Sequence, residues 1–446
     1  MARDRSSGRV APSSNPSTAT GRRPVLLRRR APEHPWANVG HRTLIVLLLA
    51  LAVLAPRAQA QQPLLLLVSL DGWRWDYIDR AATPKLRALT SRGVRAKGLI
   101  PSFPSKTFPN HYTLVTGLYP EHHGIISNNI ADPQFPKRFS TSAETSRDAR
   151  WWGGEPLWVT AIRQGLRASA MFWPGSEAAI QGVRPTEWRP FDDKVSNGDR
   201  LKQVLDWLAL PPDTRPSLIT MYLSEVDGAG HDFGPDSPQV LEAARHLDEA
   251  IGQLVSGIQA LGIIDQVTLV LVSDHGMSQL SDRRIIFLDD YVDLNTVDIV
   301  EWTPVVQLAP KTGSAEDLYR ALKGKHPALA VYKREQLPRR LHYRDNPRIP
   351  PLVGLADDGW MITSHKRFAD DKARGRNLGG DHGYDPELKS MHGLFVAAGP
   401  RIRQNLVVPE FRNVHVYDFL CAVLGVTPAK NDGDPEVTRK FFKDPS

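Results

Sequence analysis

The sequence of 446 residues contains a single cysteine, Cys421, so no disulfide bond can form within one chain. This scarcity excludes a small disulfide-stapled scaffold, and the fold must depend instead on its core, its size and bound ligands. Cys421 lies among apolar residues at helical spacing between Val416 and Leu424. We therefore interpret it as a core residue of a C-terminal helix.

No apolar run reaches the roughly 20 residues that a membrane-spanning helix needs. The run at 44–54 follows Arg42 and precedes Ala58-Gln59-Ala60, which is the order of charged region, apolar region and cleavage site in a signal peptide. We expect export, cleavage after Ala60 and a mature protein that is periplasmic or secreted and has no membrane span. An uncleaved anchor and a buried helix are the alternatives. The Ser-, Pro- and Arg-rich residues before about Gly40 are expected to be disordered.

A basic surface is missing from most of the chain, although the net charge is +7. Residues 1–60 hold ten arginines and two acids, a charge of +8, which leaves −1 for the remainder. We therefore expect no specific nucleic-acid binding by the mature part. Residues 61–446 contain no internal repeat and no long linker, which predicts one large domain after a leader at 1–60. At about 285–358 the expected strands are short and only one helix is expected, which predicts a smaller subdomain within this domain.

Apolar strands alternate with amphipathic helices along this domain. Expected strands lie at 64–70, 94–100, 168–173, 218–223, 267–273 and 394–398, and expected helices at 83–92, 109–117, 157–165, 200–208, 240–261 and 315–323. Such alternation predicts an α/β fold with a mostly parallel central sheet flanked by helices. Three strands run into a carboxylate, at Asp71, Asp227 and Asp274, and ligands bind at this end of such sheets.

Carboxylates and imidazoles occur together at two of these strand ends and at one later place in the chain. The pairs are Asp227 with His231 in a Gly-rich segment that we interpret as a turn, Asp274 with His275, and Asp381 with His382. These residue types suit zinc, and two ions about 3.5–4 Å apart form a clamp for in-line displacement at phosphorus. A simple turn at Asp71-Gly72 and a helix start at Asp274-His275 are the alternatives. The co-occurrence of all these residues favours a metal site.

The stretch Ser105-Lys106-Thr107-Phe108-Pro109-Asn110-His111 supplies a hydroxyl. Pro109 fits the first turn of a helix, so Thr107 is expected near the positive end of the helix dipole. Threonine is a weak nucleophile unless a metal or a base activates it. This position therefore favours attack on phosphorus by Thr107, activated by the predicted metals.

The motifs together resemble those of the nucleotide pyrophosphatase/phosphodiesterases of the alkaline phosphatase superfamily, over about 62–440. The matching segments are 69–72, 104–111, 117–120, 122–125, 173–176, 227–231 and 273–277. The resemblance implies an alkaline-phosphatase-like fold with a smaller inserted subdomain, in the stand-alone form of bacteria. It also implies two zinc ions per chain. One would be held by Asp227, His231 and His382, and the other by Asp71, Thr107, Asp274 and His275.

The resemblance further implies that Thr107 is the nucleophile of a covalent phosphothreonine intermediate and that Asn128 hydrogen-bonds a non-bridging phosphate oxygen. Phe108 matches the aromatic that stacks on the base of the substrate. Phe191 or Trp188 matches the second stacking wall, and Phe191 is favoured. That these aromatics are simply core residues is the alternative. The segment 129–156 resembles one in nucleotide-cleaving members, which indicates hydrolysis of nucleotides and their derivatives to nucleoside monophosphates.

Three alternative functions remain at this stage. One is a lysophospholipid or other phosphodiesterase, the second is a phosphomonoesterase on the same metals, and the third is a non-catalytic exported protein that binds phosphate esters. The intact Thr107 and the full ligand set argue against the third. A sulfatase is disfavoured because no Cys-x-Pro-x-Arg motif occurs. The sequence predicts a small nucleotide as substrate and makes no prediction of oligomeric state.

Overall fold

The computed structural model describes residues 25–29 and 63–443. The predicted leader and signal peptide therefore lie outside the described residues, apart from 25–29, which have no regular secondary structure. Residues 61–446 form one unit, and the elements below all belong to it. None of the helices in the described ranges is long and apolar enough to cross a bilayer.

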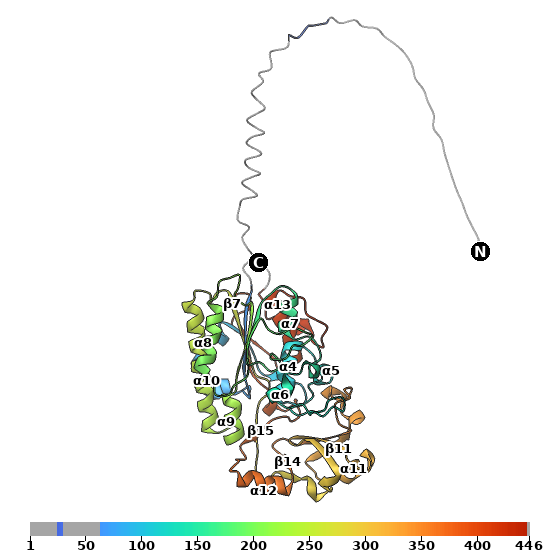
Figure 1. Ribbon diagram of the computed structural model, residues 1–446. Helices are drawn as coiled ribbons and strands as arrows, with labels where there is room; N and C mark the ends of the chain where they lie inside the picture. The colour runs from blue at the N-terminus through green and yellow to red at the C-terminus, as the bar shows by residue number, and fades with distance from the viewer. Residues whose placement is uncertain (1–24, 30–62, 444–446) are drawn as a thin grey trace, which may run out of the picture. The chain divides into compact units, whose positions relative to one another are not determined.

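The centre of this unit is an eight-stranded sheet with the order β17-β2-β16-β7-β1-β6-β4-β5 (Figure 1). Its strands are β1 (Leu64–Leu70), β2 (Gly93–Ala96), β4 (Ala168–Met171), β5 (Glu187–Arg189), β6 (Leu218–Leu223), β7 (Val267–Val272), β16 (Phe395–Ala398) and β17 (Leu406–Val408). Neighbouring strands are parallel except where β16 runs antiparallel to β7 and β2. The predicted mostly parallel α/β sheet is confirmed.

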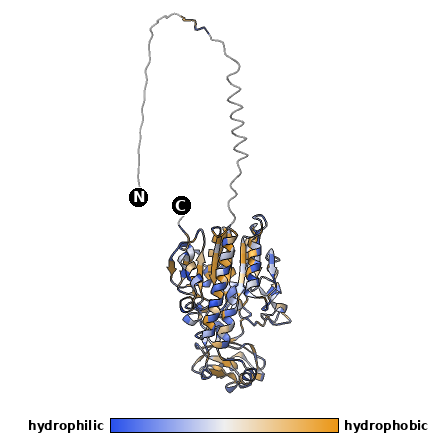
Figure 2. Cartoon of the chain, turned by 90° about the vertical axis from the view of Figure 1, so that its left-hand side faces the viewer, coloured by the Kyte–Doolittle hydropathy of each residue, from blue (hydrophilic) through white to orange (hydrophobic). Residues whose placement is uncertain are grey.

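The central strand β1 shows why the sheet needs helices on both faces. All seven of its residues are buried. Leu64, Leu66, Val68 and Leu70 pack into one apolar core, whereas Leu65 and Leu67 pack into the other, as the period of two in a strand requires. Figure 2 shows the hydrophobic residues concentrated on the strands between the helices.

Helices cover the two faces separately. The helices α3 (Pro84–Ser91), α8 (Asn197–Leu208) and α10 (Pro238–Ala260) contribute to the first core. The helices α4 (Thr107–Thr116), α7 (Leu157–Arg163) and α13 (Val416–Leu424) contribute to the second, and Cys421 is fully buried there, as predicted.

The register of the central strands aligns their carboxyl ends. Ser69 of β1 lies opposite Tyr222 of β6 on one side and Val272 of β7 on the other. Asp71 therefore emerges beside the end of β6, and Asp274 emerges beside the end of β1. This edge of the sheet carries the candidate site.

A second, four-stranded antiparallel sheet has the order β10-β11-β13-β12 and lies at the lower end of Figure 1. It is formed by β10 (Val297–Glu301), β11 (Val305–Pro310), β12 (Leu329–Lys333) and β13 (Leu352–Ala356), with α11 (Ala315–Leu322) packed against it. Val306 belongs to the core of this sheet, whereas its neighbour Val305 belongs to a core of the central sheet. The second sheet is therefore joined to the main body by a shared apolar face.

Two local expectations were wrong. The strand predicted at 94–100 is interrupted, and its end is the separate strand β3 (Leu99–Ile100). The Gly-rich turn predicted at 227–231 is instead part of the helix α9 (Glu225–Phe233). Gly230 packs closely on another segment, because a Cβ atom there would lie 2.8 Å from Met277 Cε. The glycine thus marks a close contact of a helix and not a turn.

Candidate metal and catalytic site

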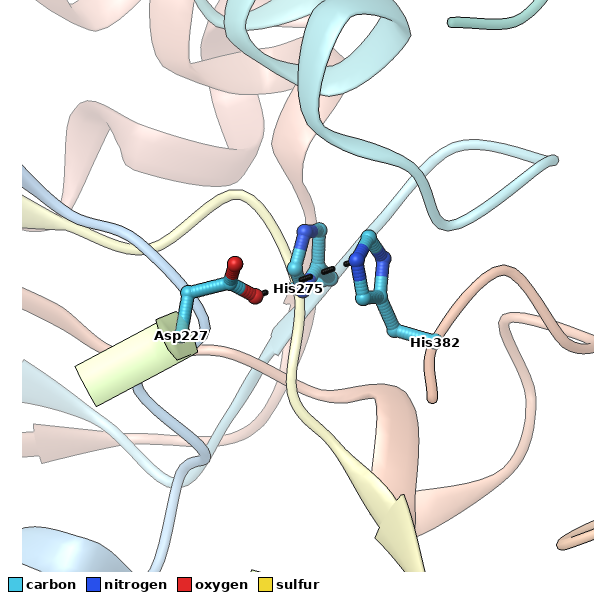
Figure 3. A group of neighbouring side chains, drawn as sticks. All are labelled: Asp227, His275 and His382. Carbon is cyan, nitrogen blue, oxygen red and sulfur yellow. Dashed lines mark ion pairs between the residues drawn. The ribbon is translucent and has the colours of Figure 1, made fainter. Parts of the chain in front are cut away.

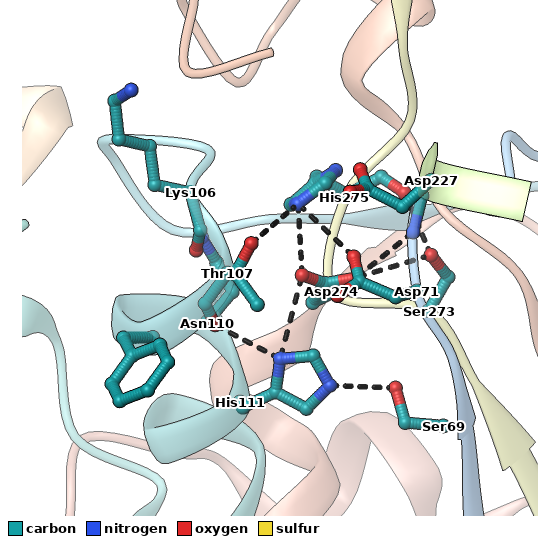
Figure 4. Close-up of polar contacts among 12 residues, drawn as sticks. Ser69, Asp71, Lys106, Thr107, Asn110, His111, Asp227, Ser273, Asp274 and His275 are labelled. Atoms are coloured by element: carbon teal, nitrogen blue, oxygen red, sulfur yellow. Dashed lines mark hydrogen bonds and ion pairs between the residues drawn. The ribbon is translucent and has the colours of Figure 1, made fainter. Parts of the chain in front are cut away.

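Thr107 is the first residue of α4 and follows the N-cap residue Lys106. Its hydroxyl Oγ1 lies 3.3 Å from His275 Nε2 (Figure 4). One turn further along α4, His111 Nδ1 donates a hydrogen bond to the Thr107 carbonyl at 2.9 Å, and Ser69 Oγ donates to His111 Nε2 at 2.7 Å. The nucleophile candidate is thus half-buried at a helix N-terminus that is tied to β1.

Asp71, Asp274 and His275 form the first cluster of potential metal ligands. His275 Nε2 lies 2.9 Å from Asp274 Oδ2 and 3.4 Å from Asp71 Oδ1. All three side chains are buried, and the Thr107 hydroxyl borders them (Figure 4). The structure therefore brings together the four residues that the sequence resemblance assigned to one metal.

Asp227, His275 and His382 form the second cluster (Figure 3). His382 Nε2 lies 3.8 Å from Asp227 Oδ1, and the His382 ring stacks on His275 at a centroid distance of 3.5 Å. His231, one helical turn after Asp227, points its Nε2 to Asp227 Oδ2 at 3.5 Å. His231 thus borders this cluster, whereas His275 belongs to both clusters, which the division into two separate sets did not anticipate.

The imidazoles of His231, His275 and His382 are each oriented by a backbone carbonyl group. Their Nδ1 atoms lie close to backbone carbonyl oxygens: His231 to Gly380 at 3.0 Å, His275 to Gly276 at 2.9 Å and His382 to Ser105 at 2.9 Å. A carbonyl only accepts, so each Nδ1 carries a proton, and each Nε2 faces a carboxylate. Histidines that ligate a metal are commonly oriented in this way.

Three buried carboxylate oxygens have no hydrogen-bond donor within the described part of the chain, namely Asp71 Oδ1, Asp227 Oδ1 and Asp274 Oδ2. Burial raises the pKa of Asp71 well above its usual range, and the charges of Asp274 and Asp227 add to this effect. Burial also acts to raise the pKa of Asp274, but the adjacent His275 and His111 hold it well below its usual range. Buried acids without donors are costly unless a cation compensates them, so this donor set fits divalent metal ions.

Two further residues shape the site: Tyr222, which was not singled out from the sequence, and Gly72, which was noted only as part of the Asp71-Gly72 segment. Tyr222 Oη donates a hydrogen bond to Asp71 Oδ2 at 2.5 Å, and the Gly72 N–H donates to Asp274 Oδ1 at 3.3 Å. Gly72 has φ +65°, and a Cβ atom there would lie 2.8 Å from Asp227 Cα. The only sequence signal for Tyr222 was its position near the end of a strand that precedes Asp227.

Asn128 lies beside the start of α4. Its Oδ1 accepts a hydrogen bond from the Phe108 N–H at 3.0 Å, which leaves its Nδ2 group as a donor. The Phe108 ring is half-buried and packs against Phe139 and Trp152 at centroid distances of 5.8 and 6.1 Å. Asn128 and the backbone of Phe108 therefore form one unit next to the Thr107 hydroxyl.

The two candidates for a second aromatic wall have different surroundings. Phe191 is 50% exposed, and its ring lies 6.1 Å from that of Tyr222, the tyrosine that binds Asp71. Trp188 lies on the edge strand β5 with the Arg184 guanidinium 5.8 Å from its ring. Phe191 thus contacts a residue that binds a candidate metal ligand, whereas Trp188 contacts a residue near the edge of the sheet.

Comparisons with known proteins agree with this arrangement. Residues 65–385 match the family described as type I phosphodiesterase / nucleotide pyrophosphatase. The chain is 37% identical over 406 residues to venom phosphodiesterase CdcPDE of Crotalus durissus collilineatus, covering 88% of this chain and 48% of the relative. It is also 37% identical to the human ectonucleotide pyrophosphatase/phosphodiesterase family member 5, covering 84% of this chain and 77% of the relative. The chain thus spans about half the length of the venom enzymes and most of the length of the human relative.

Solved structures give the same result. Murine ectonucleotide pyrophosphatase/phosphodiesterase 5, described as an inactive threonine-to-alanine variant in complex with AMP, has a TM-score of 0.81 at 36% identity. The match covers 86% of this chain and all of that one. The human counterpart has a TM-score of 0.82 at 36% identity with the same coverage. The resemblance inferred from the motifs is therefore confirmed, and the chain belongs to the type I phosphodiesterase/nucleotide pyrophosphatase family, with its alkaline-phosphatase-like fold.

Proposed function

We propose that this protein is an exported two-zinc phosphodiesterase/pyrophosphatase that hydrolyses nucleotides and nucleotide derivatives to nucleoside monophosphates. The observation that carries the proposal is the orientation of His231, His275 and His382. Their Nε2 atoms face the carboxylates of Asp227 and Asp274 near the hydroxyl of Thr107. Relatives named as nucleotide pyrophosphatases and phosphodiesterases support the assignment.

The residues present fit two divalent ions. Asp71, Thr107, Asp274 and His275 would hold one ion, and Asp227, His231 and His382 would hold the other. When bound, zinc would lower the pKa of the threonine hydroxyl and neutralise charge on the phosphoryl group. The hydrogen bonds from Nδ1 to backbone carbonyls keep the imidazoles fixed for this role.

Thr107 is the proposed nucleophile. Its Oγ1 loses a proton to solvent and forms a bond to phosphorus while the bond from phosphorus to the leaving oxygen breaks, and the leaving group is then protonated. Water subsequently displaces Thr107 from phosphorus, which releases the monophosphate and restores the hydroxyl. The Asn128 Nδ2 group donates to a non-bridging oxygen during both steps, held in place by its bond to the Phe108 N–H.

The aromatic residues favour a nucleotide over a lipid headgroup. Phe108 would stack on one face of the base, and the exposed ring of Phe191 would provide the second wall. Stacking on such rings is worth about 1–3 kcal/mol per base and tolerates any base. The AMP complex of the murine relative supports a nucleotide substrate for this chain.

Export is part of the proposal, with cleavage after Ala60 and a periplasmic or secreted mature protein. The order of charged residue, apolar run and Ala58-Gln59-Ala60 supports it. N-terminal sequencing of the exported protein is expected to begin at Gln61. A retained 44–54 segment in a membrane fraction would show that the segment is an anchor.

Replacement of the nucleophile tests the mechanism. Thr107→Ala is expected to lose several orders of magnitude in kcat, as other nucleophile deletions do, while the bound zinc measured by elemental analysis changes little. Thr107→Ser keeps the hydroxyl and is expected to retain part of the activity. Thr116→Ala, which removes a hydroxyl at the other end of α4, serves as the matched control. Near-normal turnover in Thr107→Ala would overturn the covalent mechanism.

A further inference from the structure

Glu301 is the last residue of β10 in the second sheet, and it lies against the loop that carries Asn128. Its Oε2 accepts hydrogen bonds from Ser127 Oγ at 3.0 Å and from Asn129 Nδ2 at 3.1 Å. Its Oε1 accepts from the Trp302 N–H at 3.2 Å. Both chain neighbours of Asn128 are therefore bound to the same carboxylate oxygen.

A second set of hydrogen bonds fixes Ile126, the residue before Ser127. Tyr343 Oη donates to the Ile126 carbonyl at 2.8 Å and accepts a hydrogen bond from Gln307 Nε2 at 2.8 Å. Tyr343 is fully buried and packs edge-on against Phe103 at a centroid distance of 5.0 Å. Side chains from 301–343 thus hold the backbone before Asn128 and the side chains on either side of it.

The buried Glu301 carboxylate needs the hydrogen-bond donors that this loop provides. Glu301 is only 9% exposed, and within residues 25–29 and 63–443 no Lys or Arg pairs with it within 4 Å. Its hydrogen-bond partners are a hydroxyl, an amide and a backbone N–H. A buried carboxylate of this kind is stabilised only if its donors stay in place, and charge-assisted bonds hold donors more firmly than neutral ones.

We propose that Glu301 is a positioning residue that acts through Asn128. By fixing Ser127 and Asn129, it holds the Asn128 amide in the orientation in which Oδ1 binds the Phe108 N–H and Nδ2 faces the reacting phosphate. This inference rests on the proposed role of Asn128. It gives the second sheet a part in the chemistry, although Glu301 itself touches neither metal ligands nor substrate in this arrangement. Precise placement by supporting residues of this kind is a general requirement of active sites.

A double-mutant cycle on kcat tests the proposal, with thermal melting and bound zinc measured for each variant. Asn128→Ala is expected to lower kcat by about 10²–10³-fold, as the loss of one donor to the transition state does. Glu301→Ala is expected to lower kcat by about tenfold or more with KM within about twofold, because it disturbs an interaction made mainly in the transition state. Glu301→Gln keeps the shape of the side chain and is expected to retain more activity than Glu301→Ala.

The coupling between the two sites is the deciding result. In the Asn128→Ala background, Glu301→Ala is expected to cause little further loss of kcat. Glu335→Ala is the matched control, since it makes the same chemical change at an exposed position just after β12, and it is expected to behave as wild type. If Glu301→Ala does not fold, Ser127→Ala removes one of the same hydrogen bonds and is expected to show a smaller, equally coupled loss.

Other results would overturn the inference. An equal loss of kcat from Glu301→Ala in both backgrounds would show that Glu301 acts independently of Asn128, and an unchanged kcat in Asn128→Ala would remove the group through which it acts. The test is separate from that of the nucleophile. If Thr107→Ala retains turnover while the coupling holds, the covalent mechanism fails and the positioning role stands.

Discussion

Tyr222 provides a direct test of how the site holds its metals. Its hydroxyl donates to Asp71 Oδ2 at 2.5 Å, and the second oxygen of Asp71 points into the ligand cluster (Figure 4). Burial raises the pKa of Tyr222 well above its usual value, and the charges of Asp71 and Asp227 add to this effect. The hydroxyl therefore remains a donor at neutral pH. Tyr222→Phe removes this donor and keeps the ring.

The expected loss follows from the kind of bond that is broken. A hydrogen bond to a charged group is worth about 1.5–3 kcal/mol, which corresponds to roughly 10- to 150-fold in an equilibrium constant. Removal of a residue that supports a metal ligand typically costs about 10–100-fold in metal affinity. The two ranges overlap, so Tyr222→Phe is expected to weaken zinc binding by about 10–100-fold.

Activity measured across a series of zinc buffers is the appropriate assay. The free zinc concentration for half-maximal activity is expected to rise by about 10–100-fold in Tyr222→Phe, whereas kcat at saturating zinc stays near that of the wild type. Tyr77→Phe is the matched control, because the Tyr77 hydroxyl is also buried but has no hydrogen-bond partner among the residues that the structure describes. An unchanged zinc requirement in Tyr222→Phe would refute the reasoning. An unchanged requirement with a lower kcat would show that Tyr222 acts on the reaction itself.

Three further outcomes are expected. Phe191→Ala should raise KM for a dinucleotide by about 5- to 150-fold, in line with stacking worth about 1–3 kcal/mol, and leave a small phosphodiester without a base unaffected. Trp188→Ala should change neither, and the reverse pattern would exchange the two assignments. Removal of metal by a chelator should abolish activity and lower the melting temperature, because zinc at 100 times its Kd stabilises the folded state by about 2.7 kcal/mol. An unchanged melting curve would count against metal bound in the fold. Burial raises the pKa of the Cys421 thiol to about 12, so alkylating reagents should label it only after denaturation, as mass spectrometry would show.

The strands were the most predictable part of the fold. In β1, a continuous apolar run bounded by Asp71-Gly72 has few alternatives to a strand buried on both faces. The pairing of carboxylates and imidazoles at strand ends was also visible, because parallel strands bring such ends to one edge. The helical conformation of 227–231 was not predictable, because Gly228 and Gly230 weaken a helix in isolation. In the folded chain Gly230 packs closely on Met277, a contact between parts of the chain that are distant in sequence.

The supporting residues of the site could not be found from the sequence for a related reason. Tyr222 and Glu301 reach their partners across 151 and 174 residues of sequence, and no local motif marks either of them. His111 was easier to find from the sequence, since it lies one helical turn after Thr107 in a segment already recognised. The sharing of His275 between two ligand clusters also depends on three-dimensional distances. Spacing along the chain can suggest which residues bind metal, but not how they divide between two ions.

Because the site depends on the register of the central strands, activity reports whether β1 is paired correctly. Asp71 reaches His275 and Tyr222 only because Ser69 lies opposite Tyr222 and Val272. A slip of one residue in β1 would shift Asp71 by about 3.3 Å and turn its side chain to the other face of the sheet. A molecule with such a slip would be compact yet unable to assemble the ligand set. Specific activity at saturating metal would therefore count the fraction of molecules in which β1 is paired correctly, a defect that measurements of secondary structure content would miss.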